Sequence, residues 1–125
     1  MFSTADTIVA IATPPGRGGI GVVRVSGPDA IRIVEQLTDR QEPFEPRYAT
    51  LVCVTGDAGA IDRVVVTTFI GPHSYTGEDV AEVSAHGSPV LLATIVGEAM
   101  RLGARLAEPG EFTFRAFLNG RVDLV

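Results

Sequence analysis

One stretch near the start of the chain, Thr13 to Gly27, most constrains the fold. Two consecutive prolines, Pro14 and Pro15, end the preceding segment, because proline fixes φ and lacks a backbone N–H. Three glycines among the next four residues allow the backbone to take φ > 0, which other side chains disfavour. The chain then continues from Ile20 to Val25 as an apolar, mostly β-branched run that is typical of a buried strand. The stretch therefore predicts a tight connection that leads into a core strand.

The glycine spacing also raises the question of a nucleotide-binding loop. Gly16, Gly18 and Gly21 match the G-x-G-x-x-G pattern of dinucleotide-binding proteins. In those proteins the last glycine opens a helix whose N-terminus holds the pyrophosphate, whereas a strand pattern follows here. We therefore interpret the glycines as a connection between two strands. We expect Gly18 and Gly19 to contribute through the shape of the backbone, with φ > 0 at both.

The rest of the chain alternates strand and helix patterns. Besides 20–25, strands are expected at 7–12, 49–55, 61–70, 80–85 and 104–106, and helices at 28–37, 89–102 and 111–118. A glycine-rich turn at 56–59 joins two of these strands as a hairpin, while helices connect others. This mixture favours an α+β fold, a mixed β-sheet with helices packed mainly on one face.

Composition excludes several classes of protein. The 125 residues suit one domain, and no apolar run reaches the roughly 18 residues of a membrane span. Cys53 is the single cysteine, so no disulfide framework exists and a cytoplasmic location is expected. The net charge of −5 argues against unaided binding to nucleic acid, which depends on neutralising phosphates.

Two charged residues lie in the middle of apolar strands. Arg24 interrupts the 20–25 run, and Glu82 shares one face of its strand with Val80 and Ser84. Such charges need partners when buried. In one interpretation, Arg24 and Glu82 neutralise each other inside the sheet. In the other, they form the polar floor of a ligand pocket, where a carboxylate accepts two parallel N–H donors and a guanidinium binds a carboxylate or carbonyl oxygen.

Other conspicuous side chains favour structural roles. His73 has no second ligand at metal spacing, so no metal site is predicted, and no Ser-His-Asp or Cys-His arrangement indicates a catalytic residue. A hydrogen-bonded structural role is favoured for His86 over an acid–base role. The expected defaults are core packing for Phe112, Phe114 and Phe117, turn formation for Glu78 and Asp79, and solvation for Arg121.

The helix at 89–102 predicts self-association. Its polar side chains, Thr94, Glu98 and Arg101, form one narrow stripe, and the rest of its surface is apolar. Such a helix needs extensive cover from a sheet or a second subunit. We expect a homodimer that buries roughly 1,200 Å² or more in total.

Motifs along the chain closely resemble the N-terminal domain of the MnmE (TrmE) family of tRNA modification GTPases. The motifs run in family order from Thr7 to Leu124. Between Asp29 and Ile70 the chain shares only the general pattern of the family and no specific motif. The matching segments are Thr7-Ile8-Val9-Ala10, Ala12-Thr13-Pro14-Pro15-Gly16-Arg17-Gly18-Gly19-Ile20-Gly21, Arg24-Val25-Ser26-Gly27, Ser74-Tyr75-Thr76-Gly77-Glu78-Asp79-Val80, Glu82, His86-Gly87, Pro109-Gly110-Glu111-Phe112-Thr113 and Arg115-Ala116-Phe117-Leu118-Asn119-Gly120.

The resemblance implies a domain at 1–120 that dimerises and binds 5-formyltetrahydrofolate or a related reduced folate, with 121–125 beginning the next, helical domain. It also implies a fold similar to the folate-binding domain of aminomethyltransferases. The folate contacts of the family fall on Arg24, Glu82 and Arg121. The last position is often lysine in the family, so the charge is kept while the donor geometry changes.

The resemblance further implies a longer protein with a GTPase domain that uses GTP, magnesium and potassium. Together with MnmG, a flavin- and NADH-dependent partner, such a protein modifies C5 of the wobble uridine of certain tRNAs. The GTPase motifs are absent from these 125 residues, so binding and dimerisation are expected here, without GTP hydrolysis. Two alternatives stay open: a purely structural dimerisation module, and part of a folate-dependent aminomethyltransferase, which the end at Leu124-Val125 disfavours.

Overall fold

A computed structural model describes residues 5–14 and 18–121. The elements in chain order are β1 (Ile8–Ile11), β2 (Gly18–Ser26), α1 (Ala30–Leu37), β3 (Thr50–Gly56), β4 (Gly59–Phe69), β5 (Val80–Gly87), α2 (Pro89–Arg101), β6 (Arg105–Leu106) and α3 (Glu111–Leu118). The strands form one sheet in the order β3-β4-β5-β2-β1-β6. Because β1 and β6 pair in parallel and the other neighbours are antiparallel, the predicted mixed α+β sheet is confirmed.

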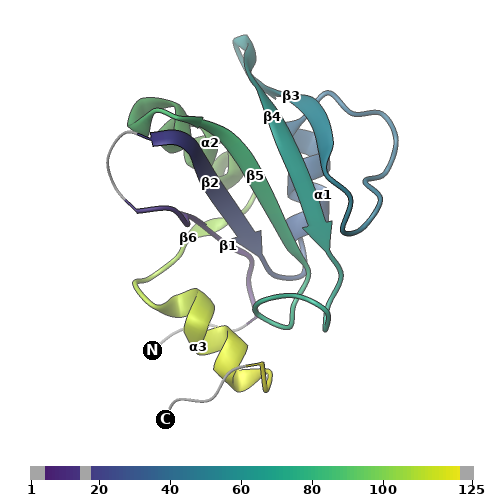
Figure 1. The fold of residues 1–125 in the computed structure, drawn as a ribbon, viewed down its shortest axis with the longest axis vertical. Coiled ribbons are helices and arrows are strands. Elements are labelled where there is room, and N and C mark those ends of the chain that lie inside the picture. Colours follow the sequence, from purple (N-terminus) through teal and green to yellow (C-terminus); the bar gives the residue numbers. More distant parts are fainter. Residues whose placement is uncertain (1–4, 15–17, 122–125) are drawn as a thin grey trace.

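The helices α1 and α2 lie side by side on one face of the sheet, as Figure 1 shows. The yellow α3 stands apart from them at one end of the sheet. The opposite face of β3, β4, β5 and β2 carries no helix in the part of the chain that the structure describes. The expectation of helices mainly on one face is therefore confirmed, and we refer to the uncovered side as the open face.

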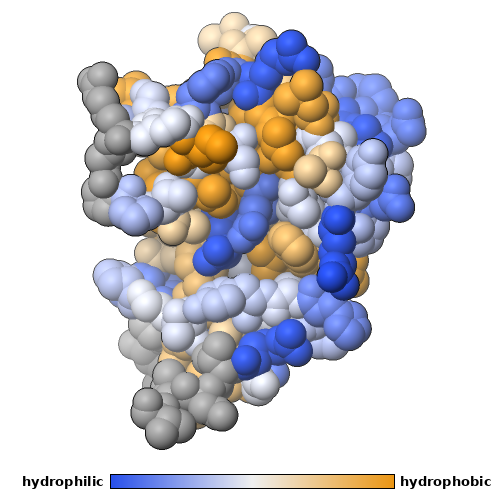
Figure 2. Space-filling view, in the orientation of Figure 1, coloured by the Kyte–Doolittle hydropathy of each residue, from blue (hydrophilic) through white to orange (hydrophobic). Residues whose placement is uncertain are grey.

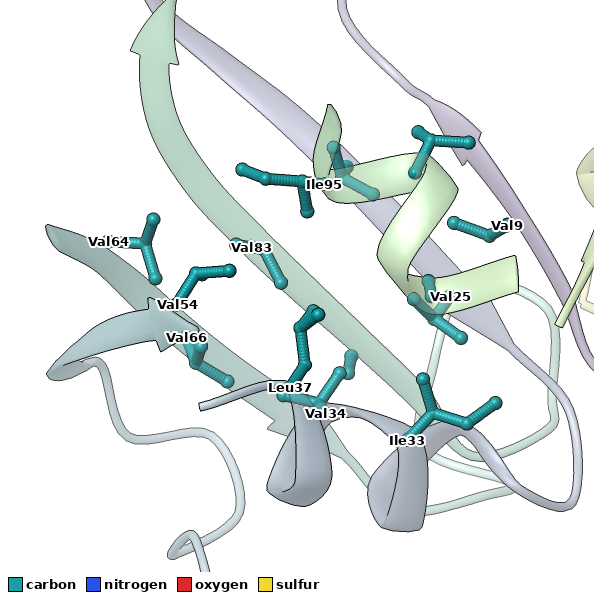
Figure 3. Close-up of a cluster of buried hydrophobic side chains, with 14 of the residues drawn as sticks. Val9, Val25, Ile33, Val34, Leu37, Val54, Val64, Val66, Val83 and Ile95 are labelled. Carbon is teal, nitrogen blue, oxygen red and sulfur yellow. The ribbon is translucent and has the colours of Figure 1, made fainter. Parts of the chain in front are cut away.

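The core fills the space between the sheet and the two helices. Strand alternation directs Val25, Val83 and Val66 toward α1 and α2, while the helices contribute Leu37 and Ile95 (Figure 3). All five side chains are fully buried. Burying a side chain of this kind stabilises a fold by about 1.5–3 kcal/mol, so this layer fixes which face of each strand is left for other uses.

The helix α2 begins and ends where its sequence predicts. Ser88 Oγ accepts a hydrogen bond from the backbone N–H of Leu91 at 3.4 Å, and Pro89 occupies the first position. Gly103 follows the helix with φ of 119°, the conformation of a glycine stop. The sheet and α1 bury one side of α2, and Val90 and Met100 are the large apolar side chains exposed on the other side. Two exposed side chains give α2 less need of a second subunit than the sequence suggests.

The prediction of φ > 0 at Gly18 and Gly19 is wrong. Both glycines belong to β2 and neither takes positive φ, while Gly16 lies outside the described residues. The close approach occurs on the neighbouring strand, where a Cβ on Gly87 would lie 2.2 Å from the carbonyl oxygen of Gly18. A Cβ on Gly19 would meet no atom within 4 Å. At this contact between β2 and β5 the requirement for glycine is therefore steric and falls on Gly87.

Within residues 5–14 and 18–121, no helix is both long and apolar enough to cross a lipid bilayer.

Candidate functional site

The two charged strand residues meet on the open face. Arg24 of β2 lies opposite Glu82 of β5, which in turn lies opposite Thr67 of β4. Arg24 donates to Glu82 Oε2 from Nε at 2.9 Å, and its Nη2 lies 2.9 Å from the same oxygen. The side chains are 24% and 28% exposed, so the pair is half-buried and still accessible from solvent. The structure thus brings two of the three predicted site residues into direct contact.

Glu82 keeps unused acceptor capacity in this pair. A carboxylate has two oxygens with about four lone-pair positions, and Arg24 uses one oxygen. Among the described residues, Oε1 of Glu82 accepts no hydrogen bond. The site can therefore take a further N–H donor without displacing Arg24.

Two aromatic rings flank the guanidinium of Arg24. Its central carbon lies 5.1 Å from the ring centre of Tyr75 and 5.6 Å from that of Phe112. Both distances suit cation–π attraction, which holds the arginine in place over the open face. The expected core role is wrong for Phe117, which is 41% exposed, whereas Phe112 and Phe114 are both half-buried and Phe112 lies beside Arg24.

Arg121 lies beyond Tyr75 rather than against the ion pair. Its Nε donates to the carbonyl oxygen of Ser74 at 3.2 Å. Arg121 and Tyr75 line an open cavity of about 400 Å³, and Tyr75 therefore borders both this cavity and Arg24. The three predicted site residues lie along one stretch of the open face, although Arg121 makes no direct contact with the other two.

The loop at 71–79 is fixed to α3 by hydrogen bonds. Tyr75 Oη and Thr113 Oγ1 are 2.8 Å apart, and Asn119 Nδ2 donates to the carbonyl oxygen of Thr76 at 2.8 Å. Asp79 Oδ1 accepts from the backbone N–H of Gly71, which confirms its predicted turn role. These bonds place Tyr75, the aromatic residue shared by the ion pair and the cavity.

A buried ionic cluster holds α3 in position, and the sequence reasoning missed it. Arg115 is 1% exposed and its guanidinium reaches Asp6 at 2.7 Å, Glu78 at 3.2 Å and Glu111 at 3.5 Å. Arg105 contacts Asp6 at 2.6 Å and Glu111 at 2.7 Å. The cluster thus links α3 to the residues just before β1, to β6 and to the loop at 71–79. The spacing of Glu111 and Arg115, one helical turn apart, is the local signal that points to it.

The two cations perturb the acidic groups of the cluster. Hydrogen bonding from Arg105, partly opposed by burial and reinforced by Arg115, lowers the pKa of Asp6 to about 2. Burial by itself would raise the pKa of Glu111, but the hydrogen bond from Arg105 and the backbone N–H of Glu108 outweigh it and lower that pKa. Both carboxyl groups are therefore charged near neutral pH and bind α3 to the sheet.

His86 lies at the other end of the open face, in the hydrogen-bonded role that was favoured. Its side chain is 76% exposed, and Nδ1 lies 2.9 Å from Asp62 Oδ2. Burial would raise the pKa of Asp62, but the hydrogen bond from His86 contributes to a net lowering. Nearby, Ile20, Leu51 and Val65 line a hollow of about 190 Å³. Figure 2 shows an apolar patch on this part of the open face, with a hydrophilic band below it.

The described residues contain no group of three His, Cys, Asp or Glu side chains placed to hold a metal ion.

The fold and the site define a small α+β domain with a half-buried ion pair on the open face of a mixed sheet. A family model described as "GTP-binding protein TrmE N-terminus" matches residues 7–121. The chain belongs to this family.

Relatives with closely similar sequences carry one name. The chain is 55% identical over 121 residues to a tRNA modification GTPase MnmE of Francisella tularensis subsp. holarctica, covering 97% of this chain. It is 54% identical over 121 residues to a protein of the same name from Legionella pneumophila, covering 96% of this chain. It spans 26% and 27% of these relatives' lengths, so it corresponds to about a quarter of each.

Proposed function

We propose that this chain is the reduced-folate-binding and dimer-forming part of a GTPase that modifies the wobble uridine of tRNA. The observation that carries the proposal is the Arg24–Glu82 pair, which lies half-buried on the open face with one carboxylate oxygen to spare. Inclusion in the TrmE N-terminal family and the name of its relatives support it.

The residues fit a ligand of the 5-formyltetrahydrofolate type. A reduced pterin presents an amino group and a ring N–H as adjacent donors, which suit the carboxylate of Glu82. It also presents a carbonyl next to that edge, which suits the guanidinium of Arg24. Tyr75 and Phe112 border the same arginine with aromatic surface. The bound folate would supply the one-carbon unit, and these side chains would bind and orient it.

Dimerisation would cover the apolar part of the open face. Leu51 and Ile20 are 57% and 69% exposed there, and both border the hollow beside Val65. A twofold axis through this patch would place the same apolar side chains of two copies against each other, as symmetric dimer interfaces require. We assign a second copy of the chain as the partner, in agreement with the dimerisation that the family resemblance implies.

The remaining steps would belong to the other three quarters of such a protein and to its partner. GTP, magnesium and potassium would bind in a GTPase domain, and an MnmG-type protein would supply flavin and NADH chemistry for the tRNA substrate. The name of the relatives, tRNA modification GTPase, supports the GTPase and tRNA parts of this assignment.

Titration calorimetry with 5-formyltetrahydrofolate tests the folate site. A hydrogen bond to a charged group contributes roughly 1.5–3 kcal/mol, so Glu82→Ala should weaken binding by about 10- to 150-fold. Glu82→Gln should also weaken it, because the amide NH₂ opposes a donor of the ligand. Glu98→Ala on α2, on the covered side of the sheet, serves as a control and should bind like the parent. Equal binding by the parent and Glu82→Ala would refute the assignment.

A purely structural ion pair is the second candidate, because Arg24 and Glu82 already satisfy each other. In that case the parent binds no folate, and Glu82→Ala acts on stability instead. Stranding a fully buried charge costs about 3–5 kcal/mol, and the exposure of about a quarter of each side chain reduces that cost here. Thermal melts of the same variants therefore separate the two functions.

A further inference from the structure

The cavity beyond Tyr75 gathers positive charge in an otherwise acidic chain. Its lining includes Arg47, His73 and Arg121 and contains no acidic residue, although the chain has 15 acidic against 10 basic side chains. We refer to this hollow of about 400 Å³ as the cationic cavity. Concentrated positive charge beside a ligand site is a feature that attracts and holds anions.

The basic side chains of this cavity are available to a ligand. The side chain of Arg47 has no hydrogen-bond or ion-pair partner within residues 5–14 and 18–121, and the same holds for His73. Arg121 donates from Nε to the carbonyl oxygen of Ser74, and its terminal nitrogens have no acceptor among the described residues. The acidic residues of the adjacent loop are engaged elsewhere, Glu78 by Arg115 and Asp79 by the N–H of Gly71.

The backbone conformation of Arg47 also fits a role in ligand binding. Arg47 has φ of 61°, a conformation that side chains other than glycine, asparagine and aspartate rarely adopt. Its N–H donates to the carbonyl oxygen of Thr68 at 2.7 Å, which ties this residue to β4 at the rim of the cavity. The main chain that carries this unpaired side chain is thus fixed at the rim of the cavity.

The cationic cavity lies next to the Arg24–Glu82 pair. On β4, Phe69 lines the cavity and lies two residues from Thr67, the partner of Glu82 in the sheet. Two residues along one face of a strand span about 7 Å. Tyr75 contacts Arg24 and also lines the cavity. An elongated ligand that is bound at Glu82 by one end can therefore extend into the cavity.

We propose that the cationic cavity binds the carboxylates of a γ-linked oligoglutamate tail, so that the site selects polyglutamylated over monoglutamylated reduced folates. This inference rests on the proposed folate function. Each added glutamate brings one more carboxylate, and Arg47, Arg121 and His73 offer several separate positions for such groups.

Calorimetry with the mono- and triglutamate forms of 5-formyltetrahydrofolate tests the inference. Contacts between exposed charges contribute about 0.2–1 kcal/mol each, so two further carboxylates should tighten binding by about 2- to 30-fold. This preference should shrink when salt rises from about 0.05 to 0.5 M, because surface charges are screened.

Variants at Arg47 locate the effect. Arg47→Gln should remove one of these contacts and so lower the triglutamate preference by about 1.4- to 5-fold while leaving monoglutamate affinity nearly unchanged, whereas Arg47→Lys should keep most of the preference. Arg101→Gln makes the same change of net charge on α2, on the other side of the sheet, and should behave like the parent. Melting curves of all variants establish that the fold is intact.

The outcomes distinguish the two levels of the proposal. If the parent binds both folates equally, or if Arg101→Gln loses the preference as Arg47→Gln does, the tail assignment is wrong while the folate site stands. If neither folate binds, the proposed function fails and the inference fails with it. If Arg47→Gln keeps the triglutamate preference but weakens binding of a transcribed tRNA, the cavity contacts RNA phosphates instead.

Discussion

Replacing Arg115 should destabilise the domain far more than replacing any exposed arginine. In Arg115→Met the side chain keeps much of its length and loses its charge inside the ionic cluster. Removing one partner of a buried ion pair costs about 3–5 kcal/mol, because the remaining charge is left uncompensated. Arg105 still neutralises Asp6 and Glu111 in the variant. Glu78, which is 16% exposed, keeps its hydrogen bond from Ser26 and loses the ion pair with Arg115. We therefore expect a loss near the lower limit, about 3 kcal/mol.

Urea unfolding at pH 7 measures this loss. With a slope of about 2 kcal/mol per molar urea for a domain of this size, the midpoint should fall by about 1.5 M. Arg101→Met is the matched control, since Arg101 also pairs with glutamate but is 45% exposed, and it should cost less than about 1 kcal/mol. Adding Glu78→Gln to Arg115→Met should cost less than the sum of the two single changes, because both remove the same contact.

A loss below about 1 kcal/mol in Arg115→Met would refute the reasoning, since the cluster would then behave like a surface ion pair. If Arg115→Met loses the expected stability but the effects of Arg115→Met and Glu78→Gln add fully, the lost free energy lies in contacts of Arg115 other than the one with Glu78.

Three further predictions follow from the packing and the charges. The pKa of Asp6 falls from 3.8 to about 2 on folding, so its contribution is present above about pH 4 and is lost as the pH drops toward 2. Because Asp6 is 38% exposed, that contribution is reduced by solvent to about 1 kcal/mol, and Asp6→Asn should flatten the acid limb of a urea-stability profile by this amount. Gly87→Ala should cost roughly 2 kcal/mol or more and Gly19→Ala less than about 1 kcal/mol in the same assay, because only the first new Cβ meets backbone. Light scattering at tens of micromolar should report a dimer for the parent and for Val90→Glu, and a monomer for Leu51→Glu; a monomeric parent, or a monomeric Val90→Glu beside a dimeric Leu51→Glu, would overturn the assigned interface.

The strands and helices could be predicted because their signals are local. The alternation of Glu82 with Val83 depends on neighbouring residues only, and it correctly assigned the two faces of β5. Ser88, Pro89 and Gly103 mark the ends of α2 through contacts within one helical turn. Period and capping are short-range properties, so one sequence is enough to read them.

The missed features depend on contacts between residues far apart in the chain. Arg115 meets Asp6 across 109 positions, and no local pattern encodes that meeting. Gly87 requires glycine because Gly18 approaches it from the neighbouring strand, whereas the glycine-rich segment attracted attention to Gly18 and Gly19. The composition of α3 favoured core phenylalanines, but its packing at the end of the sheet leaves Phe117 exposed.

The Arg24–Glu82 pair lies between these two cases. Strand alternation shows that Glu82 is on the face of Val80 and Ser84, but only the pairing register places Arg24 opposite it across 58 positions. The sequence alone leaves two interpretations of the pair open, a structural ion pair and a ligand site, and the two differ in how the carboxylate oxygens are used. A pair sealed in a core would use both carboxylate oxygens, since each unmet acceptor costs free energy there. On the open face Arg24 uses one oxygen, and solvent reaches about a quarter of each side chain. That partial saturation is what a binding site needs, because the arginine orients the carboxylate while its second oxygen stays available to a ligand.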